Sequence, residues 1–169
     1  MTMPMKLIKS ALLTPIQGVI HYGDVIDAEI ADYEFHSVKK LIWIHPNISV
    51  VSDLYPKTAS RNYRSQFITV SLSNKDTINT KTLSTYITEN ILYVNLDNFN
   101  VIKINTVNGV ENEPLKIVEG FGNLLSKYQT IRAVCVDDDS RDIEKYFQTQ
   151  NFDKTYTVNN CSLYVRKGS

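Results

Sequence analysis

Residues 91–107 read ILYVNLDNFNVIKINTV, and the fold is predicted outward from this stretch. Two apolar runs rich in β-branched and aromatic residues flank Asp97 and Asn98. Such runs favour strands, and both central residue types tolerate the positive φ of a type I′ turn. The pattern predicts an antiparallel hairpin that turns at Asp97-Asn98, with Ile102 and Val101 on opposite faces of its second strand.

The residues after this hairpin predict alternating helices and strands. PLKIVEGFGNLLSKY, residues 114–128, places apolar residues at helical spacing after a proline, which suits a first helical turn. TIRAVCV, residues 130–136, predicts a buried strand. DDSRDIEKYFQTQN predicts a short helix with acidic residues at its positive end and Asn151 as a left-handed cap. KTYTV and CSLYVRK, joined by two asparagines, predict a second hairpin.

The amino-terminal part has a different pattern. MKLIKSALL, GVIHYGDVIDAEI and VKKLIWIHP predict strands punctuated by glycine and proline, and NISVVSDLYPKTASRNYRS predicts a short helix or loop. QFITVSLS then predicts a strand and TKTLSTYITEN a helix. Because no repeat or linker stands out, a single domain over 1–169 is predicted, with a β-rich irregular part (1–65) and an α/β part (66–169).

Composition narrows the partners that the protein is expected to have. Lys+Arg and Asp+Glu each number 18, so no net field draws the chain to nucleic acid or an anionic membrane. A protein partner or self-association is expected instead. No apolar run approaches the roughly 20 residues of a membrane helix, so a cytoplasmic location is expected. Abundant Asn, Ile, Tyr and Thr are typical of an AT-rich genome, such as that of a low-GC bacterium or its phage, in which case the virion is the alternative location.

The order of elements from ILYVNL onward resembles the carboxyl-terminal half of the GCN5-related N-acetyltransferases (GNAT). IVEGFGNLL is similar to that family's pyrophosphate loop, with Gly120 and Gly122 in place and Ile117 where Gln or Arg is expected. SRDIEKYFQTQNF is similar to its later Asn, Ala, Phe-Tyr and Gly-Phe signature. The resemblance implies an α+β fold with a mixed, mainly antiparallel sheet, flanking helices, and Cys135 and Cys161 on adjacent strands.

The resemblance also implies a site for acetyl-CoA. Tyr146 is the candidate acid for the departing thiolate, one position from the family's usual tyrosine. No single base stands out among Glu89, Asp97 and Glu111. The candidate cofactor-binding residues are those whose backbone N–H groups would meet the pyrophosphate: Gly120, Phe121, Gly122 and Asn123.

The same glycines support a second interpretation. Apolar residues form one helical stripe that continues backwards through them: Leu115, Val118, Phe121 and Leu125. A helix that begins near Pro114 would bond these N–H groups to carbonyls four residues earlier, where they cannot meet a phosphate. The continuous stripe favours this interpretation.

Two functions remain open at this point. The missing Gln or Arg, the short helix, and Phe147 in place of the family's tyrosine favour a non-catalytic binding or structural protein with a degenerate GNAT-like fold and no cofactor. The alternative is an acyl-CoA-dependent N-acyltransferase that uses acetyl-CoA on an amine, so the sequence leaves enzymatic activity undecided. No metal site is predicted, because VDDDSRD matches no calcium loop and the three histidines lie far apart.

Overall fold

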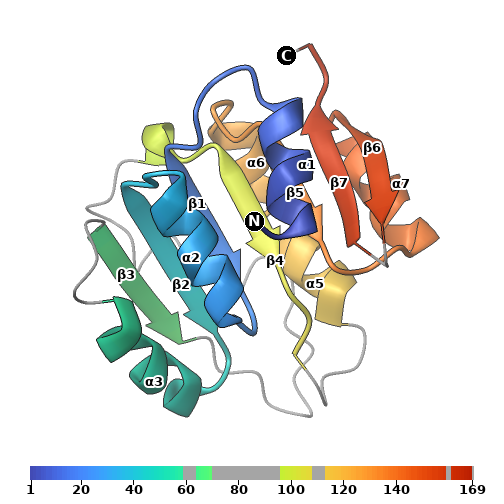
Figure 1. Cartoon of the computed structure of the whole chain (residues 1–169). Helices are drawn as coiled ribbons and strands as arrows, with labels where there is room; N and C mark the ends of the chain where they lie inside the picture. Colours follow the sequence, from blue (N-terminus) through green and yellow to red (C-terminus); the bar gives the residue numbers. More distant parts are fainter. Residues whose placement is uncertain (59–63, 70–95, 108–112, 159–160, 169) are drawn as a thin grey trace.

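The computed structural model describes residues 1–58, 64–69, 96–107, 113–158 and 161–168. Within these ranges seven strands form one sheet in the order β3-β2-β1-β4-β5-β7-β6 (Figure 1). The strands are β1 (Gly18–Tyr22), β2 (Lys40–His45), β3 (Arg64–Thr69), β4 (Val101–Ile104), β5 (Ala133–Val136), β6 (Phe152–Val158) and β7 (Cys161–Arg166). The helices are α1 (Met3–Ala11), α2 (Asp27–Phe35), α3 (Ile48–Thr58), α5 (Glu113–Gly120), α6 (Gly122–Lys127) and α7 (Arg141–Thr149), with a 3-10 turn η1 (Leu96–Asn98).

The sheet is mixed and flanked by helices, which confirms the predicted α+β class. Strands β3, β2, β1, β4 and β5 run parallel to one another, whereas β7 runs antiparallel to both β5 and β6. Parallel strand pairs therefore outnumber antiparallel ones among the described strands. The expectation of a mainly antiparallel sheet is wrong. The crossover helices between the parallel strands explain this, because a parallel connection needs a long return path over one face of the sheet.

The predicted hairpin over residues 91–107 is wrong. Asp97 and Asn98 lie in η1, where the Phe99 N–H donates to the Leu96 carbonyl over 2.9 Å. Strand β4 lies between β1 and β5 and is parallel to both, while residues 91–95 lie outside the described ranges. All four residues of β4 are buried, as in a central strand covered on both faces.

In the amino-terminal part, α1 and α2 lie where strands were predicted, whereas α3 lies where a short helix or loop was predicted. Residues 5–11 of MKLIKSALL lie in α1, whose Met5 and Ile8 are buried one helical turn apart, so the period of its apolar residues is helical. GVIHYGDVIDAEI divides into β1, a turn at Gly23 and the start of α2. The predicted strand in VKKLIWIHP is confirmed as β2. The predicted helix in TKTLSTYITEN lies outside the described residues.

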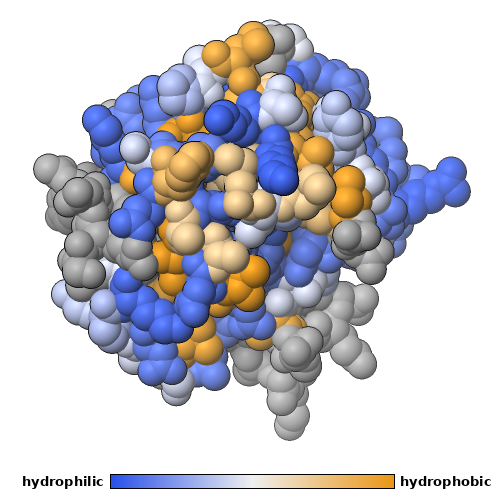
Figure 2. Space-filling view, viewed as in Figure 1, coloured by the Kyte–Doolittle hydropathy of each residue, from blue (hydrophilic) through white to orange (hydrophobic). Residues whose placement is uncertain are grey.

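The two faces of the sheet carry separate apolar cores. One packs against α5, α6 and α7 and contains Ile102 and Ile104, whereas the other packs against α1, α2 and α3 and contains Val101. The predicted alternation along β4 is therefore confirmed. Among the described residues, no helix has the length and apolar content to cross a membrane. Figure 2 shows blue side chains over much of one face, with pale orange atoms near the amino-terminal end of α1, where Met1 and Met3 are half-exposed.

The carboxyl-terminal predictions are confirmed. α7 begins after Ser140, whose hydroxyl accepts the Ile143 N–H over 3.3 Å, and β6 and β7 form the predicted hairpin. Asn151 follows α7 with a φ of 66°, in the left-handed region. Its carbonyl accepts the Lys167 N–H over 2.9 Å, so this turn connects the end of α7 to the end of β7.

Two substitutions at Asn151 test this cap. Asn151→Ala should lower the free energy of unfolding by about 1 kcal/mol, because a β-carbon disfavours positive φ and alanine lacks the polar side chain that tolerates it. Asn151→Gly should leave stability unchanged or raise it slightly. Urea unfolding curves of the two variants measure the difference, and equal stability for both would contradict the left-handed cap.

Candidate functional site

The strand order reverses between β1 and β4, and this point defines the candidate site. The chain leaves β1 towards β2 and β3, whereas β4 leads towards β5 and β7. In open sheets of this kind, ligands bind outside the carboxyl ends of the strands where the order reverses. The residues that follow β1, β2, β4 and β5 at this edge begin with Gly23, Pro46, Asn105 and Asp137.

Gly23 forms the turn at the end of β1. Its φ is 93°, and its N–H donates to the Ile44 carbonyl of β2 over 2.8 Å. A β-carbon at this position would lie 1.9 Å from the Asn105 carbonyl oxygen. The main chain after β4 therefore lies directly against the β1 turn, and only glycine fits between them. The next residues, Asp24 and Val25, carry side chains, so this turn is not a glycine-rich phosphate loop.

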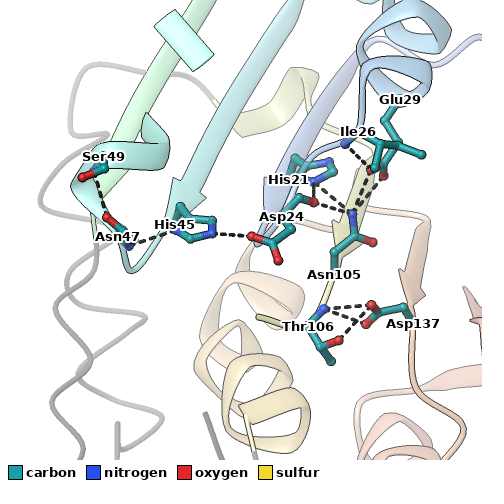
Figure 3. A network of polar contacts seen from close by, with 10 residues as sticks. All are labelled: His21, Asp24, Ile26, Glu29, His45, Asn47, Ser49, Asn105, Thr106 and Asp137. Atoms are coloured by element: carbon teal, nitrogen blue, oxygen red, sulfur yellow. Dashed lines mark hydrogen bonds and ion pairs between the residues drawn. The ribbon is translucent and has the colours of Figure 1, made fainter. Parts of the chain in front are cut away.

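The Asn105 side chain connects the end of β4 to the loop after β1 (Figure 3). Its amide nitrogen lies 2.7 Å from the Asp24 carbonyl oxygen and 3.0 Å from both carboxylate oxygens of Glu29. Its amide oxygen accepts a hydrogen bond from the Lys103 ammonium. Glu29 also accepts the Ile26 N–H over 3.1 Å at the start of α2. The Asn105 amide therefore connects the ends of β1 and β4 to the start of α2.

His45 orients the Asp24 carboxylate from the end of β2. Its Nδ1 accepts the Asn47 N–H over 2.9 Å, so its proton lies on Nε2, which donates to Asp24 Oδ1 over 2.8 Å. The His45 side chain is buried, whereas that of Asp24 is 53% exposed. The Asp24 carboxylate is thus held from one side and open to a ligand on the other.

Asp137 fixes the loop after β4 from the end of β5. Its carboxylate accepts the Thr106 N–H at 2.8 and 2.9 Å and the Thr106 hydroxyl at 3.0 Å. Both residues are half-buried. The same loop begins with Asn105, so hydrogen bonds hold it on both sides. The Asn105 amide connects it to the end of β1 and to α2, and Thr106 connects it to the end of β5.

The site carries a net negative charge. Its carboxylates come from Asp24, Glu29 and Asp137, against one ammonium from Lys103. His21 is fully buried and adds no charge, since burial holds its pKa below the usual value although the Glu29 carboxylate raises it. Its Nδ1 lies 2.7 Å from the Tyr33 hydroxyl. This edge therefore favours cationic or hydroxyl-bearing ligands and repels phosphate.

Comparisons with known proteins identify solved structures with a similar fold. No protein-family model and no curated protein matches the chain, whereas solved structures do. A protein from Listeria monocytogenes serotype 4b has a TM-score of 0.59 at 8% identity, over 100% of this chain and 69% of its own. TrmK of M. capricolum, solved with S-adenosyl-homocysteine, has a TM-score of 0.56 at 10% identity, over 99% and 69%. A SAM-dependent methyltransferase from Aquifex aeolicus has a TM-score of 0.52 at 12% identity, over 96% and 87%.

The chain shares its fold with these solved structures. The resemblance to GCN5-related N-acetyltransferases is therefore wrong, as are both functions built on it, the non-catalytic GNAT-like protein and the acyl-CoA-dependent N-acyltransferase. The cofactor expectation, none or acetyl-CoA, is corrected with them, because TrmK was solved with S-adenosyl-homocysteine. The motif similarities were misleading because the acetyltransferase fold and the fold of this chain end with the same order of elements. That order is a helix, a strand, a helix and a hairpin.

The residues predicted to bind acetyl-CoA lie away from the β1–β4 edge. α5 begins at Glu113, as in the second interpretation of the glycines, and Gly120 is its last residue. The Phe121 N–H donates to the Ile117 and Val118 carbonyls and the Phe121 ring is buried, so this N–H is not open to phosphate. Gly122 and Asn123 begin α6, which precedes β5 and therefore lies towards the amino ends of the strands.

Tyr146 is also held by the core rather than placed at the candidate site. Its hydroxyl donates to the Glu119 carbonyl over 3.5 Å. Burial, followed by the Glu119 charge, raises its pKa to about 12. The sequence did not predict the site residues at the ends of β1, β2 and β4: Asp24, Glu29, His45 and Asn105. The signal for them is Gly23, which separates a strand from a helix where only strand structure was predicted.

Glycine substitutions test the close approach of β4 to the β1 turn. Gly23→Ala should lower the free energy of unfolding by about 3 kcal/mol, because positive φ and a clash with backbone oxygen act together. Gly168 has a φ of 77°, and a β-carbon added there would have nothing within 4 Å, so Gly168→Ala should cost about 1 kcal/mol. Chemical denaturation measures the free energy of unfolding of both variants. An equal decrease in the two variants would mean that the clash at residue 23 is relieved.

The buried His21 predicts a pH dependence of stability. Its folded-state pKa lies below 6.5, so the unfolded chain binds more protons at acidic pH. The free energy of unfolding should therefore fall as the pH drops from 7 to 5, by at most about 1.4 kcal/mol per pH unit for this group. Denaturation at several pH values measures the slope.

The slope should become smaller in His21→Gln. His36→Gln is the matched control, because the pKa of His36 is also lowered by burial but its ring is only half-buried. The control should therefore reduce the slope less. An unchanged slope in His21→Gln would show that other groups cause the acid sensitivity.

Proposed function

We propose that the protein is a methyltransferase that binds S-adenosylmethionine at the carboxyl ends of β1, β2 and β4. The observation that carries the proposal is the anionic, glycine-poor lining of the edge where the strand order reverses. The fold shared with methyltransferases supports it, and TrmK was solved with the product of this cofactor.

The charge of the lining selects among nucleoside cofactors. Acetyl-CoA and dinucleotides carry phosphates, which need free N–H groups or cations and are repelled by carboxylates. S-adenosylmethionine has no phosphate, carries a sulfonium and an ammonium, and offers two ribose hydroxyls. Asp24 and Glu29 supply the carboxylates that such groups prefer. When bound, the cofactor supplies a methyl group activated by the positively charged sulfur.

Asp24 is the residue proposed to bind the cofactor directly. Its carboxylate is half-exposed, while the buried His45 fixes one of its oxygens. A carboxylate oriented in this way accepts a ribose hydroxyl or an ammonium without first losing side-chain freedom. Glu29 is already bonded to Asn105 and Ile26, so its part is to position the loop and to contribute negative charge.

Thr106 and Asp137 position the segment after β4. Their three contacts fix the main chain immediately beyond Asn105. Loops at this edge, held by a rigid sheet, are where substrates bind in related architectures. The methyl acceptor is therefore expected on the β4–β5 side of Asp24.

Calorimetry tests the proposal. Both S-adenosylmethionine and S-adenosyl-homocysteine should bind with micromolar affinity, and acetyl-CoA and NAD should not bind. Asp24→Asn should weaken binding of S-adenosylmethionine about tenfold or more, because the amide retains the shape but not the charge.

Asp27→Asn provides the matched control. Asp27 lies three residues further along the chain, its side chain is 87% exposed, and its oxygen lies 3.4 Å from the Lys57 nitrogen. The control should bind S-adenosylmethionine as the wild type does. Failure of the folded wild-type protein to bind either form of the cofactor would overturn the proposal.

A further inference from the structure

Cys135 and Cys161 form a close thiol pair across two neighbouring strands. Their sulfur atoms lie 2.8 Å apart. Cys135 is in β5 and Cys161 begins the antiparallel β7, which confirms the predicted placement on adjacent strands. Both thiols are free. The separation exceeds a disulfide bond of about 2.05 Å by less than 1 Å, so bond formation requires only a small side-chain movement.

The surroundings of the pair keep it ordered. Cys135 is fully buried and Cys161 is 8% exposed, within the core under α1. Figure 1 shows α1 lying over β5 and beside β7. Residues on parallel strands that share a register position face the same side, so Lys103 of β4 lies beside Cys135.

The two thiols have different roles in their mutual hydrogen bond. The bond from Cys135 lowers the pKa of Cys161, whereas the same bond, with burial, raises the pKa of Cys135. Cys161 therefore ionises more readily than Cys135. Cys161 is also the more exposed of the two, so it is the sulfur that a small oxidant meets first.

We propose that Cys135 and Cys161 form an oxidation site that closes to a disulfide with hydrogen peroxide. The Cys161 thiolate attacks one peroxide oxygen, the O–O bond breaks, and a sulfenic acid and hydroxide form. Cys135 sulfur then attacks the Cys161 sulfur and displaces the hydroxyl group as water. Two thiols and one peroxide thus give one disulfide and two waters, and sulfur loses two electrons.

The bridge would join β5 to β7 directly beside the candidate site. Asp137 lies two residues after Cys135, and its carboxylate holds Thr106. The oxidation site does not depend on the proposed methyltransferase function, because its chemistry uses only the two thiols and peroxide.

Intact-mass spectrometry of the reduced native protein after peroxide treatment tests the proposal. The wild-type chain should lose the mass of two hydrogen atoms, resist alkylation after denaturation, and regain both thiols with dithiothreitol. The melting temperature of the oxidised form should rise by about 5 °C or more, because the bridge closes a loop of 26 residues. Addition of oxygen without loss of hydrogen, or two thiols that remain alkylatable, would overturn the proposal.

Two variants separate the steps. Cys161→Ser should abolish the mass loss, and Cys135→Ser should stop at a Cys161 sulfenic acid that dimedone captures. If Cys135→Ser does not fold, Cys135→Ala serves the same purpose, since alanine leaves no unpaired hydroxyl in the core. Dimedone capture at Cys135 in the Cys161→Ser variant, with none at Cys161 in the other, would overturn the order of attack.

Discussion

The contact between Gly23 and the Asn105 main chain is the constraint on which the site depends. A single β-carbon would close the space between the β1 turn and the end of β4. Because the glycine allows this approach, the Asn105 amide reaches Asp24 and Glu29 in the adjoining loop and helix. The position where the strand order reverses is therefore a closely packed junction.

The interactions that build this junction also determine its charge. The Asn105 amide nitrogen donates towards both carboxylate oxygens of Glu29, and the Lys103 ammonium donates to the Asn105 amide oxygen. Carboxylates therefore serve as structural acceptors here and at the same time make the edge anionic. A phosphate ligand would have to overcome this charge, whereas a cationic ligand would benefit from it without any further residue.

Local signals in the sequence predicted the parts of the fold that depend on neighbouring residues. α7, its Asn151 cap and the β6–β7 hairpin rest on signals within a few residues, and they were predicted correctly. β4 was assigned correctly as a strand but with the wrong partner. Its parallel neighbours come from distant parts of the chain, and no local turn specifies them.

The candidate site could not be predicted because its residues meet only through those long-range pairings. Asn105 and Asp24 are 81 positions apart, and Thr106 and Asp137 are 31 apart. Gly23 was recognised as strand punctuation, but a strand was predicted where α2 follows it. Had that run been divided at the glycine, a strand-turn-helix unit would have indicated the edge where ligands bind.

The antiparallel β7 has a chemical consequence that a further parallel strand would not have. Because β7 runs antiparallel to β5, it begins at the edge of the sheet where β5 ends. Cys161 at the start of β7 therefore meets Cys135 near the end of β5. In a parallel strand the first residue would lie at the opposite end, beside the start of β5. The strand direction that distinguishes this edge of the sheet therefore also places two thiols in contact next to Asp137.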